Sequence, residues 1–152
     1  MDRVNPDEEI LEFAISREVE AYHFYQALAS RVDSSEMRKV FEDLAKEELE
    51  HKARLELEIM KTGKTVAVQQ KLTPRSSSDY IISDDESQFD MDYKDMLLLG
   101  MEKEEASFRT YVNLVANARD EESQEVLLAL AEDEVRHKLR FETEYDMLLK
   151  KT

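Results

Sequence analysis

Apolar residues recur every three or four positions along most of the chain, and this spacing predicts four amphipathic helices. We expect the helices at about residues 6–31, 34–62, 92–118 and 121–150. The first has a clear start, because Asn5 can cap it and Pro6 suits the first helical position. Gly63 marks the end of the second, since glycine readily adopts the left-handed conformation that follows many helices.

The lengths of the connections predict how these helices pack. Only a few residues join the first helix to the second and the third to the fourth, so each pair should form an antiparallel hairpin. The connection at residues 63–91 is long enough to travel the length of a helix, which would make the second and third helices parallel. The sequence therefore predicts one all-α domain over residues 1–152, a four-helix bundle with a single long crossover. A linker between two separate domains is the alternative, but it would leave each hairpin with an uncovered apolar face.

The composition agrees with a helical protein and narrows its class. The 152 residues include two Gly, two Pro and no Cys, which excludes disulfides and thiolate metal sites. No apolar run is long enough for a membrane span, and the acidic N-terminus lacks the features of a signal peptide, so we expect a cytoplasmic protein. A net charge of −15 argues against binding to nucleic acid or anionic membranes. It favours solubility, with attraction of metal cations as the alternative.

Each predicted helix has one apolar seam, and ionisable residues interrupt the four seams at six places. These residues are Glu18, Glu48, His51, Glu104, Glu134 and His137. Burying four carboxylates and two imidazoles among apolar side chains is prohibitive unless their charges are compensated. A solvated charged face is the alternative, but these residues share their seams with Leu and Phe.

The six residues follow an internal repeat. Two segments, LAKEELEHKARLE at residues 44–56 and LAEDEVRHKLRFE at residues 130–142, share seven of thirteen letters at an offset of 86 residues. The same offset relates Glu18 to Glu104 and Tyr25 to Tyr111. The chain therefore reads as a two-helix unit used twice, and an approximate twofold axis would bring all six residues to one level of the bundle.

This set of residues predicts a metal centre. A Glu and a His three positions apart lie on one side of a helix and can hold the same ion. Two divalent cations would balance four carboxylates, and mixed carboxylate and imidazole ligands without thiolate suit iron or manganese better than structural zinc. Bundles with two iron or two manganese ions use this pattern, with one Glu from each of two helices and Glu-x-x-His from each of the others. We expect two iron ions, with manganese or zinc as substitutes.

Further residues are candidates for a supporting role. Tyr25 and Tyr111 lie two turns from Glu18 and Glu104, and either pack as core residues or hold a ligand carboxylate through the hydroxyl group. Gly100 indicates a close approach of a neighbouring helix, or space beside the metals.

Two acidic residues can support the histidines in the same way. Glu47 and Asp133 each precede a predicted ligand Glu. Either could hold the outward ring nitrogen of the histidine from the other hairpin, which would fix the orientation of that ring.

Four segments of the chain carry a family pattern: SREVEAYHFY, KEELEH, EKEEASFRTY and EDEVRH. With these segments the chain resembles the rubrerythrin-like branch of the ferritin-like di-iron carboxylate superfamily over nearly its whole length. The resemblance implies a ferritin-like four-helix bundle with a di-iron centre that Glu48 and Glu134 bridge. Glu18 and Glu104 would then be terminal ligands, and each histidine would give one nitrogen. It also implies a homodimer that reduces hydrogen peroxide or reacts with dioxygen.

The chain departs from that pattern in two places. Without Cys it lacks the rubredoxin domain of full-length rubrerythrin, so electrons would come from an external donor such as a rubredoxin-type protein. Ser107 stands where rubrerythrin has an additional Glu one turn after the third-helix ligand. We therefore expect an oxidoreductase, with an iron-binding or iron-handling protein without turnover, or a purely structural metal site, as alternatives.

Overall fold

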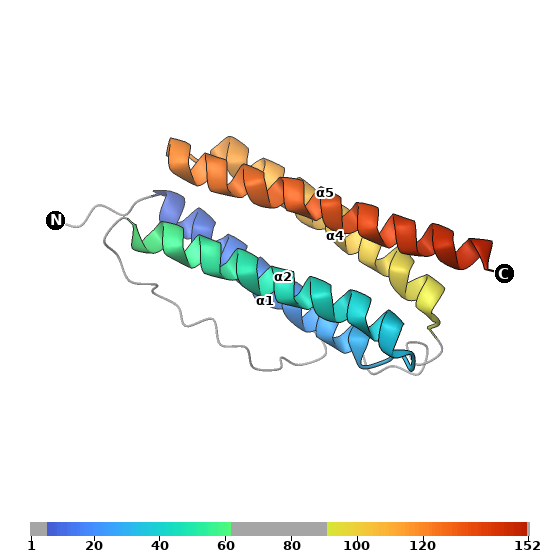
Figure 1. Cartoon of the computed structure of the whole chain (residues 1–152). Helices are drawn as coiled ribbons and strands as arrows, with labels where there is room; N and C mark the ends of the chain where they lie inside the picture. Colours follow the sequence, from blue (N-terminus) through green and yellow to red (C-terminus); the bar gives the residue numbers. More distant parts are fainter. Residues whose placement is uncertain (1–5, 62–90, 152) are drawn as a thin grey trace.

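The computed structural model describes residues 6–61 and 91–151, which form four long helices (Figure 1). They are α1 (Pro6–Ala29), α2 (Ser35–Met60), α4 (Tyr93–Asn117) and α5 (Glu121–Lys150). The predicted spans differ from these helices by two residues or fewer at each end. Ser34 caps α2 and Asp92 caps α4, each through a side-chain oxygen that accepts a backbone N–H of the first turn.

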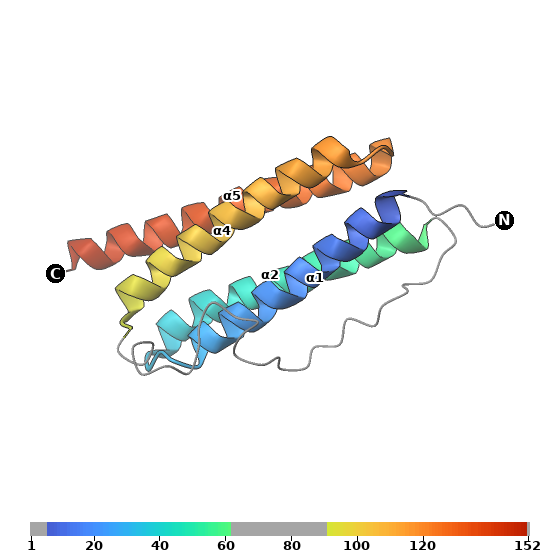
Figure 2. The ribbon, with the colours of Figure 1, turned by 180° about the vertical axis from the view of Figure 1, so that it is seen from behind.

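The helices form two antiparallel hairpins, α1 with α2 and α4 with α5, that lie side by side as two layers (Figures 1 and 2). Helices α2 and α4 run in the same direction, as the predicted crossover requires. The prediction of an all-α, ferritin-like four-helix bundle is thus confirmed. The crossover itself lies almost entirely outside the described residues, as does Gly63, so the single domain over residues 1–152 stays a prediction. No helix in the described part of the chain is long and apolar enough to cross a membrane.

The apolar seams are buried and form two separate clusters. One cluster surrounds Phe41 and Phe141 near the end of the bundle that holds the α1–α2 turn. The other surrounds Leu55 and Leu127 near the end that holds the α4–α5 turn. The ionisable residues of the seams lie between the two clusters along every helix. Buried side chains outside the seams, such as Phe24 and Ile15, show that each helix contacts more than one neighbour.

Gly100 on α4 is required by a close approach, as its position in the seam predicted. A methyl group at this position would lie 2.8 Å from the ring of Phe141 on α5. That ring has little freedom to move, because it packs against the rings of Tyr25 and Phe41. The repeat explains the glycine: the corresponding residues of the first hairpin are Ala14 and the smaller Leu55. In the second hairpin, the loss of the alanine methyl group at Gly100 leaves room for the larger ring of Phe141.

Asp7 in the first turn of α1 joins the two hairpins at one end of the bundle. Its buried carboxylate accepts hydrogen bonds from the backbone N–H groups of Arg119 (2.9 Å) and Asp120 (2.6 Å) in the α4–α5 turn. Asp120 is the N-cap residue of α5, but its own side chain makes no capping hydrogen bond. A residue from the other hairpin therefore fixes the turn that leads into α5.

Replacing Asp7 with Ala should lower the free energy of unfolding by about 1–3 kcal/mol, because two backbone donors lose a charged acceptor. The matched control is Glu9→Ala, which removes the same charge from the same turn at an exposed position and should change stability by less than about 0.5 kcal/mol. Urea unfolding of both variants measures the difference. Equal midpoints for the two variants would show that the Asp7 contacts do not stabilise the bundle.

Candidate metal centre

All four helices contribute to one layer of buried ionisable side chains between the two apolar clusters. None of these residues is more than 4% exposed. They are the six residues predicted from the seams, namely Glu18 on α1, Glu48 and His51 on α2, Glu104 on α4, and Glu134 and His137 on α5. A continuous series of contacts runs from Glu18 through His51, Glu134 and His137 to Glu104, and Glu48 contacts His51. The structure therefore brings all six residues together.

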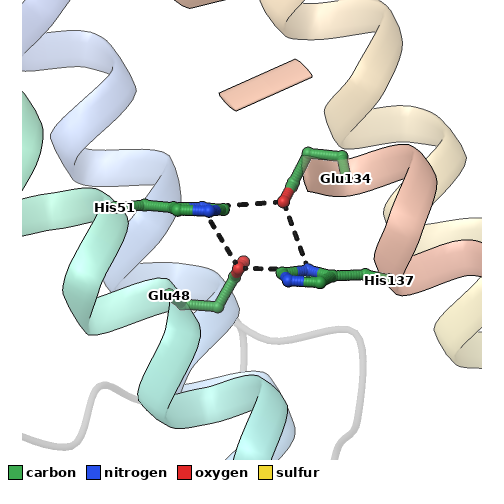
Figure 3. A group of neighbouring side chains, drawn as sticks. All are labelled: Glu48, His51, Glu134 and His137. Carbon is green, nitrogen blue, oxygen red and sulfur yellow. Dashed lines mark ion pairs between the residues drawn. The ribbon is translucent and has the colours of Figure 1, made fainter. Parts of the chain in front are cut away.

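The centre of the layer consists of the two Glu-x-x-His motifs. One ligand atom from each of Glu48, His51, Glu134 and His137 lies within 4.8 Å of the others. Figure 3 shows the four side chains pointing toward one another, two from α2 and two from α5. The spacing of three residues explains this convergence, since it places the Glu and the His of each motif on the same side of the helix, one turn apart.

Both histidines turn the Nδ1 atom into the layer. The Nδ1 atom of His51 lies 2.8 Å from Glu18 and 3.4 Å from Glu48. The Nδ1 atom of His137 lies 3.3 Å from Glu104 and 3.4 Å from Glu134. The two rings stack with centroids 5.6 Å apart and planes inclined by 10°. Each half of the layer thus offers one imidazole nitrogen beside two carboxylates of the same hairpin.

The outward Nε2 atoms face carboxylates from the opposite hairpin, and these are the two acidic residues that the sequence predicted there. His51 Nε2 lies 3.1 Å from Asp133, and His137 Nε2 lies 3.6 Å from Glu47. Arg136 forms an ion pair with Asp133, which is only 22% exposed. Such outer carboxylates fix the orientation and the tautomer of a histidine ligand. The second hairpin therefore holds the ring of His51 by a hydrogen bond, whereas Glu47 of the first hairpin lies near His137 without making one.

The two candidate tyrosines behave differently. Tyr25 is fully buried, and its hydroxyl group donates a hydrogen bond of 2.5 Å to Glu104. The hydroxyl group of Tyr111 is buried without a hydrogen-bond partner among the described residues, although it lies close enough to Glu18 for that charge to act on it. Burial, followed by the nearby carboxylate charges, raises the pKa of both phenols well above its ordinary value. Tyr25 thus holds a predicted ligand in place, whereas Tyr111 packs beside one.

Burial raises the pKa of several layer carboxylates. The pKa of Glu48 rises well above its ordinary value, because the charges of Glu134 and Glu18 add to the effect of burial. Burial and the charge of Glu104 raise the pKa of Glu134 to about 7. Burial and Glu134 also raise the pKa of Glu18, although His51 opposes the shift.

The histidines respond to the same carboxylates. Burial opposes a positive charge on His137, but the hydrogen bond with Glu104 and the nearby carboxylates of Glu134 and Glu47 outweigh this effect and raise its pKa to about 12. Burial is also outweighed at His51, where the hydrogen bond to Glu18 raises the pKa. Without metal, the layer therefore holds protons that the unfolded chain would release.

The donor atoms of this layer fit a metal centre. Both oxygens of Glu48, both oxygens of Glu134 and one oxygen of Glu104 are buried without a hydrogen-bond partner in the described part of the chain. Buried polar groups are normally paired, so these oxygens need a compensating partner. Carboxylate oxygens and imidazole nitrogens without thiolate are ligands that suit iron and manganese. The role of each residue as a ligand stays a prediction.

One further residue beside this layer was not identified from the sequence. Lys103 precedes Glu104 on α4 and is only 8% exposed, with its ammonium group 5.5 Å from the centroid of the Phe24 ring. Burial lowers the pKa of this ammonium group, and the charge of Arg17 adds to the effect, while Glu48 and Glu104 are among the groups that oppose it. The repeat pairs Lys103 with Arg17, but position in the repeat does not reveal that only one of these side chains turns inward.

A four-helix bundle that buries two Glu-x-x-His motifs against two further Glu residues is the arrangement of ferritin-like dimetal carboxylate proteins. The sequence model of the rubrerythrin family matches residues 9–145. The chain belongs to the rubrerythrin family, as its resemblance predicted.

Solved structures with a similar fold include two proteins from different organisms. A hypothetical protein from Pyrococcus furiosus is 25% identical, with a TM-score of 0.67 over 95% of this chain and 90% of that chain. KatB, a manganese catalase from Anabaena, is 15% identical, with a TM-score of 0.71 over 97% of this chain and 75% of that chain. At this low identity, the likeness to KatB shows the fold alone. No curated protein matches the sequence.

The stability of the metal-free protein should fall as the pH rises. The folded layer binds more protons than the unfolded chain, because the pKa values of Glu18, Glu48, Glu134 and both histidines are raised. The loss should begin above the ordinary Glu pKa of 4.5, continue through the value of about 7 for Glu134, and extend further as the histidines lose their protons.

Metal-loaded protein should show the opposite trend near neutrality, because ligation needs deprotonated groups and stabilises the folded state. Thermal melting of metal-free and iron-loaded protein between about pH 5 and 8 measures both trends. We expect the gap between the two melting temperatures to widen with rising pH. A gap of the same size at every pH would show that these groups do not form one buried metal-binding layer.

Proposed function

We propose that this chain is a non-haem di-iron carboxylate oxidoreductase that reduces hydrogen peroxide or reacts with dioxygen. The observation that carries the proposal is the buried layer of four carboxylates and two imidazoles, in which the oxygens of Glu48 and Glu134 have no hydrogen-bond partner among the described residues. Membership of the rubrerythrin family supports the same reading.

The positions of the side chains suggest a role for each. Glu48 and Glu134 would bridge two ions, since each lies close to the inward nitrogens of both histidines. Glu18 would add a ligand to the ion at His51, and Glu104 would add a ligand to the ion at His137. A pair of iron ions would supply two electrons to an oxidant, one from each ion.

The protein's own residues would prepare and protect this centre. Asp133 and Glu47 would orient the imidazole rings, and Tyr25 would hold Glu104 in place through its hydroxyl group. The apolar clusters on both sides would exclude water and so strengthen every electrostatic interaction within the layer. These 152 residues hold no Cys that could carry electrons, so we expect an external donor such as a rubredoxin-type protein. We also expect a cytoplasmic homodimer.

An iron-binding or iron-handling protein without turnover is the second candidate. Two observations favour it: the sequence has no Cys, and Ser107 is found in place of the additional Glu of the rubrerythrin pattern. Manganese is the first substitute to test for iron, because the ligand set suits both metals and KatB, of similar fold, is a manganese catalase.

Iron-replete protein should contain about two iron ions per chain, and Glu48→Ala should lose both. Removing this carboxylate takes away a bridge and leaves the remaining ligands unable to share two ions. The control is Glu50→Ala, an exposed position on the same helix, which should keep its metal. Elemental analysis of anaerobically purified protein gives the counts. An alanine variant at position 48 that keeps both ions would show that Glu48 is not a bridge.

Repeated turnover would distinguish an enzyme from an iron-handling protein. Reduced, iron-loaded protein should be oxidised by about one hydrogen peroxide per pair of irons, with two protons taken up and two waters formed. A chemical reductant should then restore the reduced state through repeated cycles without loss of iron. Stopped-flow absorption and iron analysis after each cycle test both points. Iron that is released after one oxidation would support handling instead of catalysis.

A further inference from the structure

Lys103 places a positive charge inside the bundle beside the carboxylate layer. Its side chain is 8% exposed, and its ammonium group lies over the ring of Phe24 at 5.5 Å from the centroid. A cation over an aromatic face is stabilised electrostatically. The charge also acts on the neighbouring carboxylates, since Glu48 and Glu104 are among the groups that favour the charged form. Lys103 directly precedes Glu104 on α4 and is itself buried.

The repeat provides an internal comparison for this lysine. The corresponding residue of the first hairpin is Arg17, which is 32% exposed and forms an ion pair of 3.4 Å with Glu20. The two hairpins therefore carry a cation at the same position of the repeat, but only the second hairpin turns it inward. The buried positive charge of Lys103 is therefore a departure from the approximate twofold symmetry of the layer.

This lysine changes the charge balance of a loaded centre. Two divalent cations would balance the four layer carboxylates, so Lys103 would leave one positive charge in excess. The carboxylates around the layer do not cancel it. Glu20, which favours the charged form of Lys103, is paired with Arg17 at 3.4 Å. Asp133 is paired with Arg136, and Glu47 is 45% exposed to solvent. An uncompensated charge inside a protein is costly, and an anion that entered the centre would remove that cost.

We propose that Lys103 is a positioning residue that gives the metal-loaded centre its affinity for a small anion. This inference rests on the proposed dimetal function and specifies its substrate class. Hydrogen peroxide can bind as its conjugate base, with one negative charge, by releasing a proton to solvent, whereas dioxygen has no proton to release and enters as a neutral molecule. The lysine therefore favours peroxide as the oxidant.

A structural role is the main competing explanation. In that case, Lys103 would only compensate the carboxylates of the metal-free protein. Its replacement would then lower stability or metal content, but it would leave the anion affinity of any loaded centre unchanged. The affinity of a loaded centre for an unreactive anion distinguishes the two roles without any need for turnover.

The test uses the full chain loaded with Co²⁺, with sodium azide as the anionic probe. Azide binding is followed by the visible absorption of Co²⁺ at constant ionic strength, and cobalt content is measured for every sample. Lys103→Met should bind azide at least about tenfold more weakly than the unmodified chain, while Lys103→Arg should restore most of the affinity. Arg17→Met removes the same charge from the corresponding, partly exposed position and should change azide affinity by less than about twofold.

Three results would overturn the proposal. One is an unchanged azide affinity in Lys103→Met with the full cobalt content, and another is an equal loss of affinity in Arg17→Met. Where Lys103→Met does not fold, Lys103→Gln takes its place, and unchanged affinity in that variant would be the third. Failure of the unmodified chain to bind Co²⁺ would instead refute the dimetal centre itself, so the two proposals fail in different ways.

Discussion

The structure depends on the compensation of four carboxylates that are buried in one layer of a four-helix bundle. Each of them is at most 2% exposed, and burial together with their mutual repulsion raises the pKa of Glu48 and Glu134. An isolated charge inside a protein is tolerated only when it is neutralised or paired. Protons and the two histidines can serve this purpose in the metal-free protein, and divalent cations would do so in the loaded protein. The apolar clusters on both sides offer these carboxylates no polar partner of their own.

The internal repeat explains how the chain assembles such a layer from two hairpins. Each hairpin brings one Glu and one Glu-x-x-His motif, and each places a carboxylate beside the outer ring nitrogen of the other hairpin's histidine. Asp133 hydrogen-bonds to His51, and Glu47 lies 3.6 Å from His137. The two halves are therefore joined by reciprocal polar contacts at the level where both are most highly charged. Asp7 adds a second connection at the end of the bundle. Stability and metal binding consequently depend on the same contacts between hairpins.

Periodicity predicts the helices and the layer, because both follow from positions along a single helix. A seam residue such as Glu18 or Glu104 is buried wherever the helix packs, and the constant offset of 86 residues places corresponding residues at the same level. Contacts between the hairpins that involve no residue of the repeat are not predicted in this way. The Asp7 contact with the α4–α5 turn is one example.

The inward orientation of Lys103 is harder still to predict from sequence. A lysine has a long side chain that can point toward solvent or along the bundle, and its direction does not follow from helical phase. The repeat related Lys103 to Arg17 but could not show that the two residues would differ in exposure. The hydrogen bond of Tyr25, which Tyr111 does not repeat, is a departure from symmetry of the same kind.

Ser107 and Lys103 together bear on the charge of the centre. Ser107 is 8% exposed and lies one turn after Glu104, where the rubrerythrin pattern has an additional Glu. A fifth carboxylate at that position would itself neutralise the ammonium group of Lys103, and two divalent cations would then leave the centre without excess charge. Serine carries no charge, so the positive charge of Lys103 stays uncompensated on the Glu104 side of the layer. The two departures are therefore linked: the carboxylate that this chain lacks is the one whose absence gives its buried lysine an effect on an incoming anion.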